Sequence, residues 1–300
     1  MGGLVVAGQL AYGCASGGDD VDDDDGVGGA SSTSSSAGGM GGGVTVSVGV
    51  GGSGGSAIVT EVFGHSGTTL YRLDPATNVV SEVGDFTNCG ENSVLDIALD
   101  KDSNLWATKR ERLYRVDRTT ASCTLVNDLG MNGYPDSLSF VPEGTVDPNV
   151  EALVGYVDAD YVRINTISGA ITVITENALT GGVISSGDIV SVIDGGTYLT
   201  VKDDFSQPGD TCNDSDCIVE INPATGAIVK DFGDIGYDDV FGLAFWGGKA
   251  YGFSREGVLF EVTFGTNNVA STVVPFPSAP AGLEFFGAGS ATSVPVEPPQ

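Results

Sequence analysis

The stretch LYRLDPAT at residues 70–77 recurs in altered form four more times along the chain, and this repeat decides the fold. Each copy has two apolar residues, an Arg or Glu, an apolar residue, a small polar residue, two turn residues and a hydroxyl. The other copies are LYRVDRTT at 113–120, YVRINTIS at 161–168, IVEINPAT at 218–225 and LFEVTFGT at 259–266. A second apolar run follows each copy, so the repeat predicts a β-hairpin.

Two further strands are expected in each repeat. The candidates for the innermost strand are LDIAL at 95–99, SLSFV at 137–141, DIVSV at 188–192, FGLAF at 241–245 and GLEFF at 282–286. The second strands are NLWATK, EALVGY, TYLTVK and KAYGFS, which follow the first four. GLEFF has no hairpin after it, and the first hairpin is preceded only by AIVTEV at 57–62. We expect these two fragments to complete one sheet and so to close a ring without free edges.

The sequence therefore predicts an all-β fold, a β-propeller of five four-stranded blades over residues 57–289, with a six-bladed ring as the alternative. The repeats resemble those of extracellular propellers of the YVTN, PQQ-like and NHL kinds, both in the LYR(L/V)D-x-x-T hairpins and in DKDSNLWAT at 100–108. This resemblance implies an architecture and says little about activity. Residues 290–300 are expected to be a flexible tail whose removal leaves the melting temperature unchanged.

The N-terminal segment indicates export. Residues 10–14, LAYGC, resemble the end of a bacterial lipoprotein signal, which implies an export signal over 1–14 and lipidation of Cys14. Residues 15–56 are rich in Gly, Ser and Asp, a composition that predicts a disordered tether. Ala15 after the cysteine implies, by the usual sorting pattern of such lipoproteins, an outer-membrane location, periplasmic or at the cell surface.

The remaining cysteines suit an oxidising compartment. Cys89, Cys123, Cys212 and Cys217 are an even number, as two disulfides require. Cys212 and Cys217 close a very short loop, which is a disulfide clip or a metal or redox site. Cys89 with Cys123 is the remaining pair, and its bond would have to run along a blade.

Charge limits the partners. The chain has 300 residues and a net charge of −28, which argues against binding of nucleic acid or of anionic membrane surfaces. Beyond residue 56 there are still 34 acidic and 12 basic residues, a net charge of −22. We therefore expect the only membrane contact to be the lipid anchor, and we expect a monomer that binds a protein or a glycan.

Acidic residues at the strands supply candidate metal ligands. Asp96, Asp136, Asp188 and Asp239 stand at or just before four innermost strands, where their carboxylates would lie near one mouth of the channel and could bind Ca²⁺. The competing interpretation is that these aspartates cap turns. Asp100, Asp102 and Asn104 have the spacing with which a calcium-binding loop begins, but a turn between two strands is the favoured interpretation of these residues. The acidic residues around the clip are interpreted as solvated surface; they are Asp203, Asp204, Asp210, Asp214 and Asp216.

No catalytic motif is present. His65, the only histidine, stands in a Gly- and Ser-rich segment and is expected to be exposed. Trp106 and Trp246 are expected to pack between blades. The sequence thus favours a non-enzymatic, lipid-anchored binding scaffold of the cell envelope. The alternatives are a Ca²⁺-dependent, lactonase-like hydrolase with a metal at the channel mouth and a purely structural envelope protein.

Overall fold

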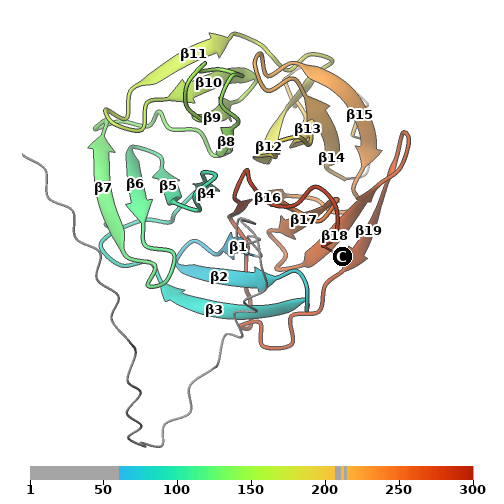
Figure 1. Ribbon diagram of the computed structural model, residues 1–300, viewed down its shortest axis with the longest axis horizontal. Coiled ribbons are helices and arrows are strands. Elements are labelled where there is room, and N and C mark those ends of the chain that lie inside the picture. Colours follow the sequence, from blue (N-terminus) through green and yellow to red (C-terminus); the bar gives the residue numbers. More distant parts are fainter. Residues whose placement is uncertain (1–60, 207–210, 213–214, 300) are drawn as a thin grey trace, which may run out of the picture. The chain divides into compact units, whose positions relative to one another are not determined.

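A computed structural model describes residues 61–206, 211–212 and 215–299. Five antiparallel sheets of four strands each are arranged in a ring (Figure 1). The fold is therefore a five-bladed β-propeller, as the repeat count predicts, and the six-bladed alternative is wrong. Among the described residues, no helix has the length and apolar character that a transmembrane span needs.

The blades are numbered here in ring order, and each is written from its innermost to its outermost strand. Blade one contains β20 (Gly287–Ser290), β1 (Val62–His65), β2 (Thr69–Asp74) and β3 (Val79–Asp85). Blade two contains β4 (Asp96–Leu99), β5 (Leu105–Lys109), β6 (Arg112–Val116) and β7 (Cys123–Asp128). Blade three contains β8 (Ser139–Val141), β9 (Ala152–Val157), β10 (Asp160–Ile164) and β11 (Ile171–Thr175). Blade four contains β12 (Val183–Ser191), β13 (Thr197–Asp203), β14 (Cys217–Ile221) and β15 (Ile228–Asp234), and blade five contains β16 (Val240–Trp246), β17 (Lys249–Ser254), β18 (Leu259–Phe264) and β19 (Val269–Val273).

The repeated motif forms the two outer strands of each blade, as predicted. In β2 the residues Leu70, Tyr71 and Leu73 are buried, whereas Arg72 is exposed. The polar residue that ends the strand makes the turn: the Asp74 carboxylate accepts hydrogen bonds from the N–H of Ala76 (3.0 Å) and the hydroxyl of Thr77 (2.9 Å). Asp117, Asn165 and Asn222 accept equivalent bonds in the next three repeats. The order of residue types that these repeats share is thus explained by the hydrogen bonds that the Asp or Asn side chain accepts within its own turn.

Ring closure occurs as predicted, but with different strands. β20 pairs with β1, from Val62 opposite Ser290 to His65 opposite Gly287. GLEFF at 282–286 precedes this strand and is not part of it. Of AIVTEV at 57–62, Val62 begins β1 and Glu61 lies outside it, while residues 57–60 lie outside the described part of the chain.

Close packing at the axis explains why a strand of small residues closes the ring. A Cβ atom on Gly287 would lie 2.2 Å from Oδ1 of Asp96 and 2.5 Å from Nε2 of His65, and one on Gly242 would lie 2.8 Å from the Cβ of Ala288. Bulky residues cannot occupy this position. Phe285 is buried instead between blades one and five, with its ring 5.1 Å from that of Phe253.

The segment after β20 packs against the ring, in contrast to the flexible tail predicted for residues 290–300. Residues 291–298, here called the C-terminal strap, follow Ser290, and Ala291, Thr292 and Val294 are buried. The N–H of Ile193 in blade four donates to the carbonyl of Thr292 (2.8 Å), and that of Gly247 in blade five donates to the carbonyl of Pro295 (2.7 Å).

Both predicted disulfides are present. Cys212 and Cys217 are bonded across a sequence separation of 5 residues, and Cys89 and Cys123 across 34. The second bond joins the connection after β3 to the first residue of β7. It does run along a blade edge, because Thr87 forms a parallel bridge with Ser122 and accepts the N–H of Cys123 (2.8 Å). This disulfide therefore links blade one covalently to blade two.

Candidate functional site

One end of the ring, here called the upper face, gathers the connections that leave each second strand and those that enter each innermost strand. These connections comprise residues 66–68, 86–95, 110–111, 129–138, 158–159, 176–182, 204–206, 211–212, 215–216, 235–239, 255–258 and 274–286. Cavities of about 570, 320, 260 and 640 Å³ open among them. The C-terminal strap lies at the other end, the lower face. The upper face therefore has the recesses that a binding site needs.

Three of these cavities adjoin one another through shared or consecutive residues of blades two to five, and together they are here called the acidic sector. Eight aspartates and two basic residues line them, so the local field is strongly negative. The aspartates are Asp136, Asp158, Asp160, Asp203, Asp204, Asp216, Asp238 and Asp239, and the basic residues are Arg110 and Lys202.

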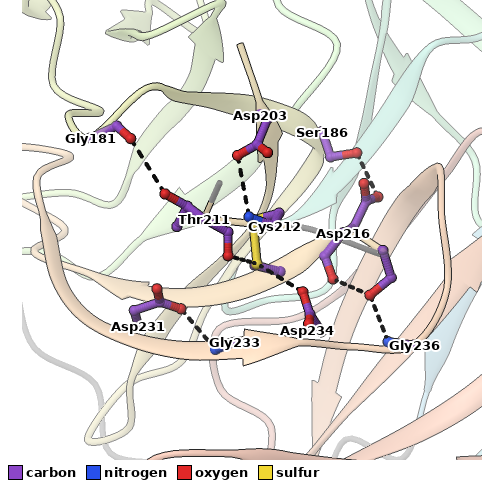
Figure 2. The surroundings of a disulfide bond; sticks show 12 residues. Gly181, Ser186, Asp203, Thr211, Cys212, Asp216, Asp231, Gly233, Asp234 and Gly236 are labelled. Atoms are coloured by element: carbon purple, nitrogen blue, oxygen red, sulfur yellow. Dashed lines mark hydrogen bonds between the residues drawn. A yellow bond between two sulfur atoms is a disulfide. The ribbon is translucent and has the colours of Figure 1, made fainter. Parts of the chain in front are cut away.

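The cavity of about 640 Å³ lies beside the Cys212–Cys217 clip. Figure 2 shows the hydrogen bonds around this clip. The clip holds the connection between β13 and β14, and the N–H of Cys212 donates to Oδ1 of Asp203 (3.2 Å). The hydroxyl of Thr211 donates to the carbonyl of Gly181 (3.4 Å) and so ties the same connection to the segment before β12. Phe205, at the edge of this cavity, is 92% exposed.

Asp216 anchors this cavity from within. Its Oδ2 accepts hydrogen bonds from the hydroxyl of Ser186 (2.6 Å) and the N–H of Val240 (2.7 Å), which joins blade four to blade five. Burial raises the pKa of Asp216 to about 6, although these two hydrogen bonds oppose the rise. The prediction that Asp216 lies on a solvated face is therefore wrong; Asp210 and Asp214 lie outside the described residues.

The structure divides the four predicted metal ligands into different environments. Asp96 and Asp188 are fully buried at the upper end of the channel, and each acts on the pKa of the other. Asp136 is exposed at the rim, and Asp239 faces Arg255 at 3.8 Å. Within residues 61–206, 211–212 and 215–299, no three His, Cys, Asp or Glu side chains form a group that could hold a metal ion. The predicted four-carboxylate calcium site is thus not formed.

Asp100 follows the turn interpretation. Its Oδ1 accepts the N–H groups of Asp102 (3.0 Å) and Asn104 (2.9 Å), and the Asn104 amide donates to both carboxylate oxygens. All of these bonds lie within the connection between β4 and β5. The alternating acidic residues therefore shape a turn.

His65 is buried, contrary to the exposed position predicted for it. It ends β1, where its Nδ1 lies 2.8 Å from the carbonyl of Ser66 and its ring meets that of Phe86 edge-on at 5.7 Å. Burial lowers the pKa of His65 to about 4, so the ring is neutral at neutral pH. Neither the Gly- and Ser-rich context nor the lack of a catalytic motif could signal this burial. Trp106 lies 6.3 Å from the ring of Phe140 in blade three, which confirms for this residue the predicted packing between blades, and Trp246 is buried.

Comparisons with known proteins bear on the fold alone. No family model matches the chain, and no curated protein matches it. A chain in the crystal structure of a nidogen/laminin complex is 13% identical, with 77% of this chain and 84% of that chain covered and a TM-score of 0.45. A protein of unknown function from Bacteroides caccae is 11% identical, with 71% and 73% covered and a TM-score of 0.35. The class of the protein is therefore set by its own architecture, a five-bladed β-propeller.

Proposed function

We propose that the protein is an exported binding scaffold whose acidic sector docks a basic segment of another protein. The observation that carries this proposal is that, among the described residues, eight aspartates and only two basic residues line three adjoining cavities on one face. A cationic polypeptide gains from such a field, whereas a neutral glycan does not. Stacked blades and two disulfides hold the rim connections in place, which suits recognition by loops on a rigid frame.

The proposal includes attachment to the cell envelope. Both disulfides fit an oxidising compartment, and the LAYGC segment supports lipidation of Cys14 and an outer-membrane location. Changing Cys14→Ser should release the exported protein from membranes into the soluble fraction. Retention of the variant on membranes would argue against the lipid anchor and leave the docking proposal unaffected.

Docking is tested with a decalysine peptide as the probe, by titration at low ionic strength. The double variant Asp158→Asn with Asp238→Asn removes two exposed charges from the acidic sector. We expect it to weaken decalysine binding several-fold because the local field is reduced.

The matched control is Asp194→Asn with Asp102→Asn on lower-face connections. Asp194 and Asp158 are both exposed and both have positive φ (60° and 55°), a conformation that Asn tolerates. The two double variants have the same net charge, so a general charge effect would weaken binding equally in both. Equal weakening would contradict a site in the acidic sector.

A further inference from the structure

Two fully buried aspartates face each other at the upper end of the channel. Asp96 begins β4 in blade two and Asp188 lies in β12 in blade four, and both are 0% exposed. Their blades are not neighbours in the ring, because blade three stands between them. The two carboxyl groups are nevertheless close enough for each to act on the pKa of the other. A bond between them would join two blades that are not neighbours and that share no sheet.

The hydrogen-bond donors around the pair are distributed unequally. Oδ1 of Asp188 accepts the N–H of Ile189 (2.6 Å), and Oδ2 accepts the N–H of Leu243 in β16. Oδ1 of Asp96 accepts the N–H of Ile97 (2.8 Å), whereas Oδ2 of Asp96 is buried and has no hydrogen-bond partner among the described residues. An ionised carboxylate only accepts hydrogen bonds, so two ionised groups cannot bond to each other. A hydrogen bond between them therefore needs one proton.

We propose that Asp96 is a neutral carboxylic acid at neutral pH and that its Oδ2 donates the proton to the Asp188 carboxylate, which ties blade two to blade four across the channel. The proton belongs on Asp96 because Oδ2 is the oxygen that lacks an N–H donor. The negative charge belongs on Asp188, both of whose oxygens accept N–H bonds.

The surroundings agree with this assignment. The N–H of Leu138 faces Asp96 from the segment before β8, and that of Ala288 in β20 faces Asp188. His65, at the end of β1, is the neighbouring titratable side chain, and burial keeps it neutral. Burial raises the pKa of both carboxyl groups, and the charge of Asp188 raises that of Asp96 further.

A calcium ion fits this position less well than a proton. Ca²⁺ takes six to eight oxygen ligands. Three of the four carboxylate oxygens here already face N–H groups, which a cation would repel. The donor pattern therefore distinguishes the shared proton from a metal site built on the same two residues.

Two isosteric variants of the full chain separate the roles of the aspartates. In Asp96→Asn the amide can donate to Asp188 where the proton did, so we expect a melting temperature at pH 8 equal to or above that of the wild type. In Asp188→Asn the amide N–H₂ would face the N–H of Ile189 or Leu243. We expect its melting temperature to fall by about 5–10 °C at every pH.

The pH dependence gives a second readout. Between pH 7 and pH 9 the unfolded chain has both aspartates ionised, whereas the folded chain holds one proton until the raised pKa of Asp96 is passed. The unfolding equilibrium constant of the wild type should therefore increase with pH above pH 7 for as long as the folded chain holds this proton, by at most roughly tenfold per pH unit. His65 and Asp216 do not interfere, because they titrate near pH 4 and pH 6. Asp96→Asn should remove the dependence.

Infrared spectroscopy of the wild type decides the matter even if a variant does not fold. A protonated carboxylic acid should give its own C=O band at pH 7, and this band should persist in the control variant Asp216→Asn. Absence of the band, or equal losses of melting temperature in Asp96→Asn and Asp188→Asn, would overturn the proposal. Stabilisation of the wild type by calcium chloride that is lost in Asp96→Asn would show a bound cation instead.

Discussion

At the scale of single residues, the burial and titration of a side chain depend on its place in the folded ring more than on its residue type. Asp96, Asp136, Asp188 and Asp239 are equivalent in the sequence, yet two are fully buried and two lie at the rim. His65 stands in a turn-like context and is nevertheless buried beside Gly287. Titration behaviour here follows from packing between blades, which no local pattern encodes.

His65 makes a prediction about acid stability. Its pKa is about 4 in the folded chain and 6.5 in the unfolded chain, so between these values the unfolded chain binds more protons and stability rises with pH. The variant His65→Gln has no such titration. The difference in unfolding free energy between wild type and His65→Gln should increase by on the order of 3 kcal/mol from pH 4 to pH 6.5 and stay constant above. Urea unfolding at a series of pH values measures it.

Comparing the wild type with His65→Gln separates the effect of His65 titration on stability from that of the titrating aspartates. Asp216, with its pKa raised to about 6, makes stability fall with rising pH in part of the same window, but it does so equally in both proteins. A difference that does not change with pH would show that His65 titrates normally and that its ring reaches water.

At the scale of elements, the outer hairpins were predictable and the innermost closing strand was not. The hairpins combine apolar alternation with an Asp or Asn that makes its own turn, and both signals are local. β20 is GAGS, which has neither alternation nor bulky apolar residues. Its position is fixed by the narrow space between β16 and β4, so only the ring as a whole selects it. The strap was missed for the same reason, because its Val and Thr are buried by other blades.

Truncations test the closing strand and the strap. Ending the chain at Pro280 removes β20 and should unfold the protein, because β1 and the neighbouring blades lose their partner. Ending it at Ser290 keeps β20 but removes buried Val294 and the bonds to Ile193 and Gly247, which should cost about 3–5 kcal/mol. Ending it at Val296 is the control and should cost little. Thermal melting gives the order, and no loss on ending at Ser290 would show that the strap is not bound in solution.

The two disulfides should contribute unequally. In the loop-entropy view, the bond between Cys89 and Cys123 stabilises by about 4 kcal/mol, and the bond between Cys212 and Cys217 by about 2 kcal/mol, because the second closes a much shorter loop. Paired Cys→Ser variants, measured by urea unfolding, should show this order. A larger loss from the Cys212 and Cys217 pair would mean that the clip holds the acidic sector in a way that loop length does not describe.

At the scale of the whole molecule, charge acts against the compact state. The chain beyond residue 56 carries a net charge of −22, while its ion pairs lie at the surface and contribute little. Raising sodium chloride from 10 mM to 150 mM shortens the screening length from about 30 Å to about 8 Å. We expect the melting temperature to rise by at least about 2 °C, because repulsion among carboxylates is weakened. A falling melting temperature would show that the ion pairs outweigh this repulsion.

The direction of β1 determines the face of the ring on which the described chain begins. Val62 pairs with Ser290 at the end of the channel that the strap covers, and His65 pairs with Gly287 at the opposite end. The polypeptide therefore enters the ring from the lower side. The described part of the chain thus begins on the face opposite the aspartate-lined recesses, so its first strand leaves those recesses free on the upper face.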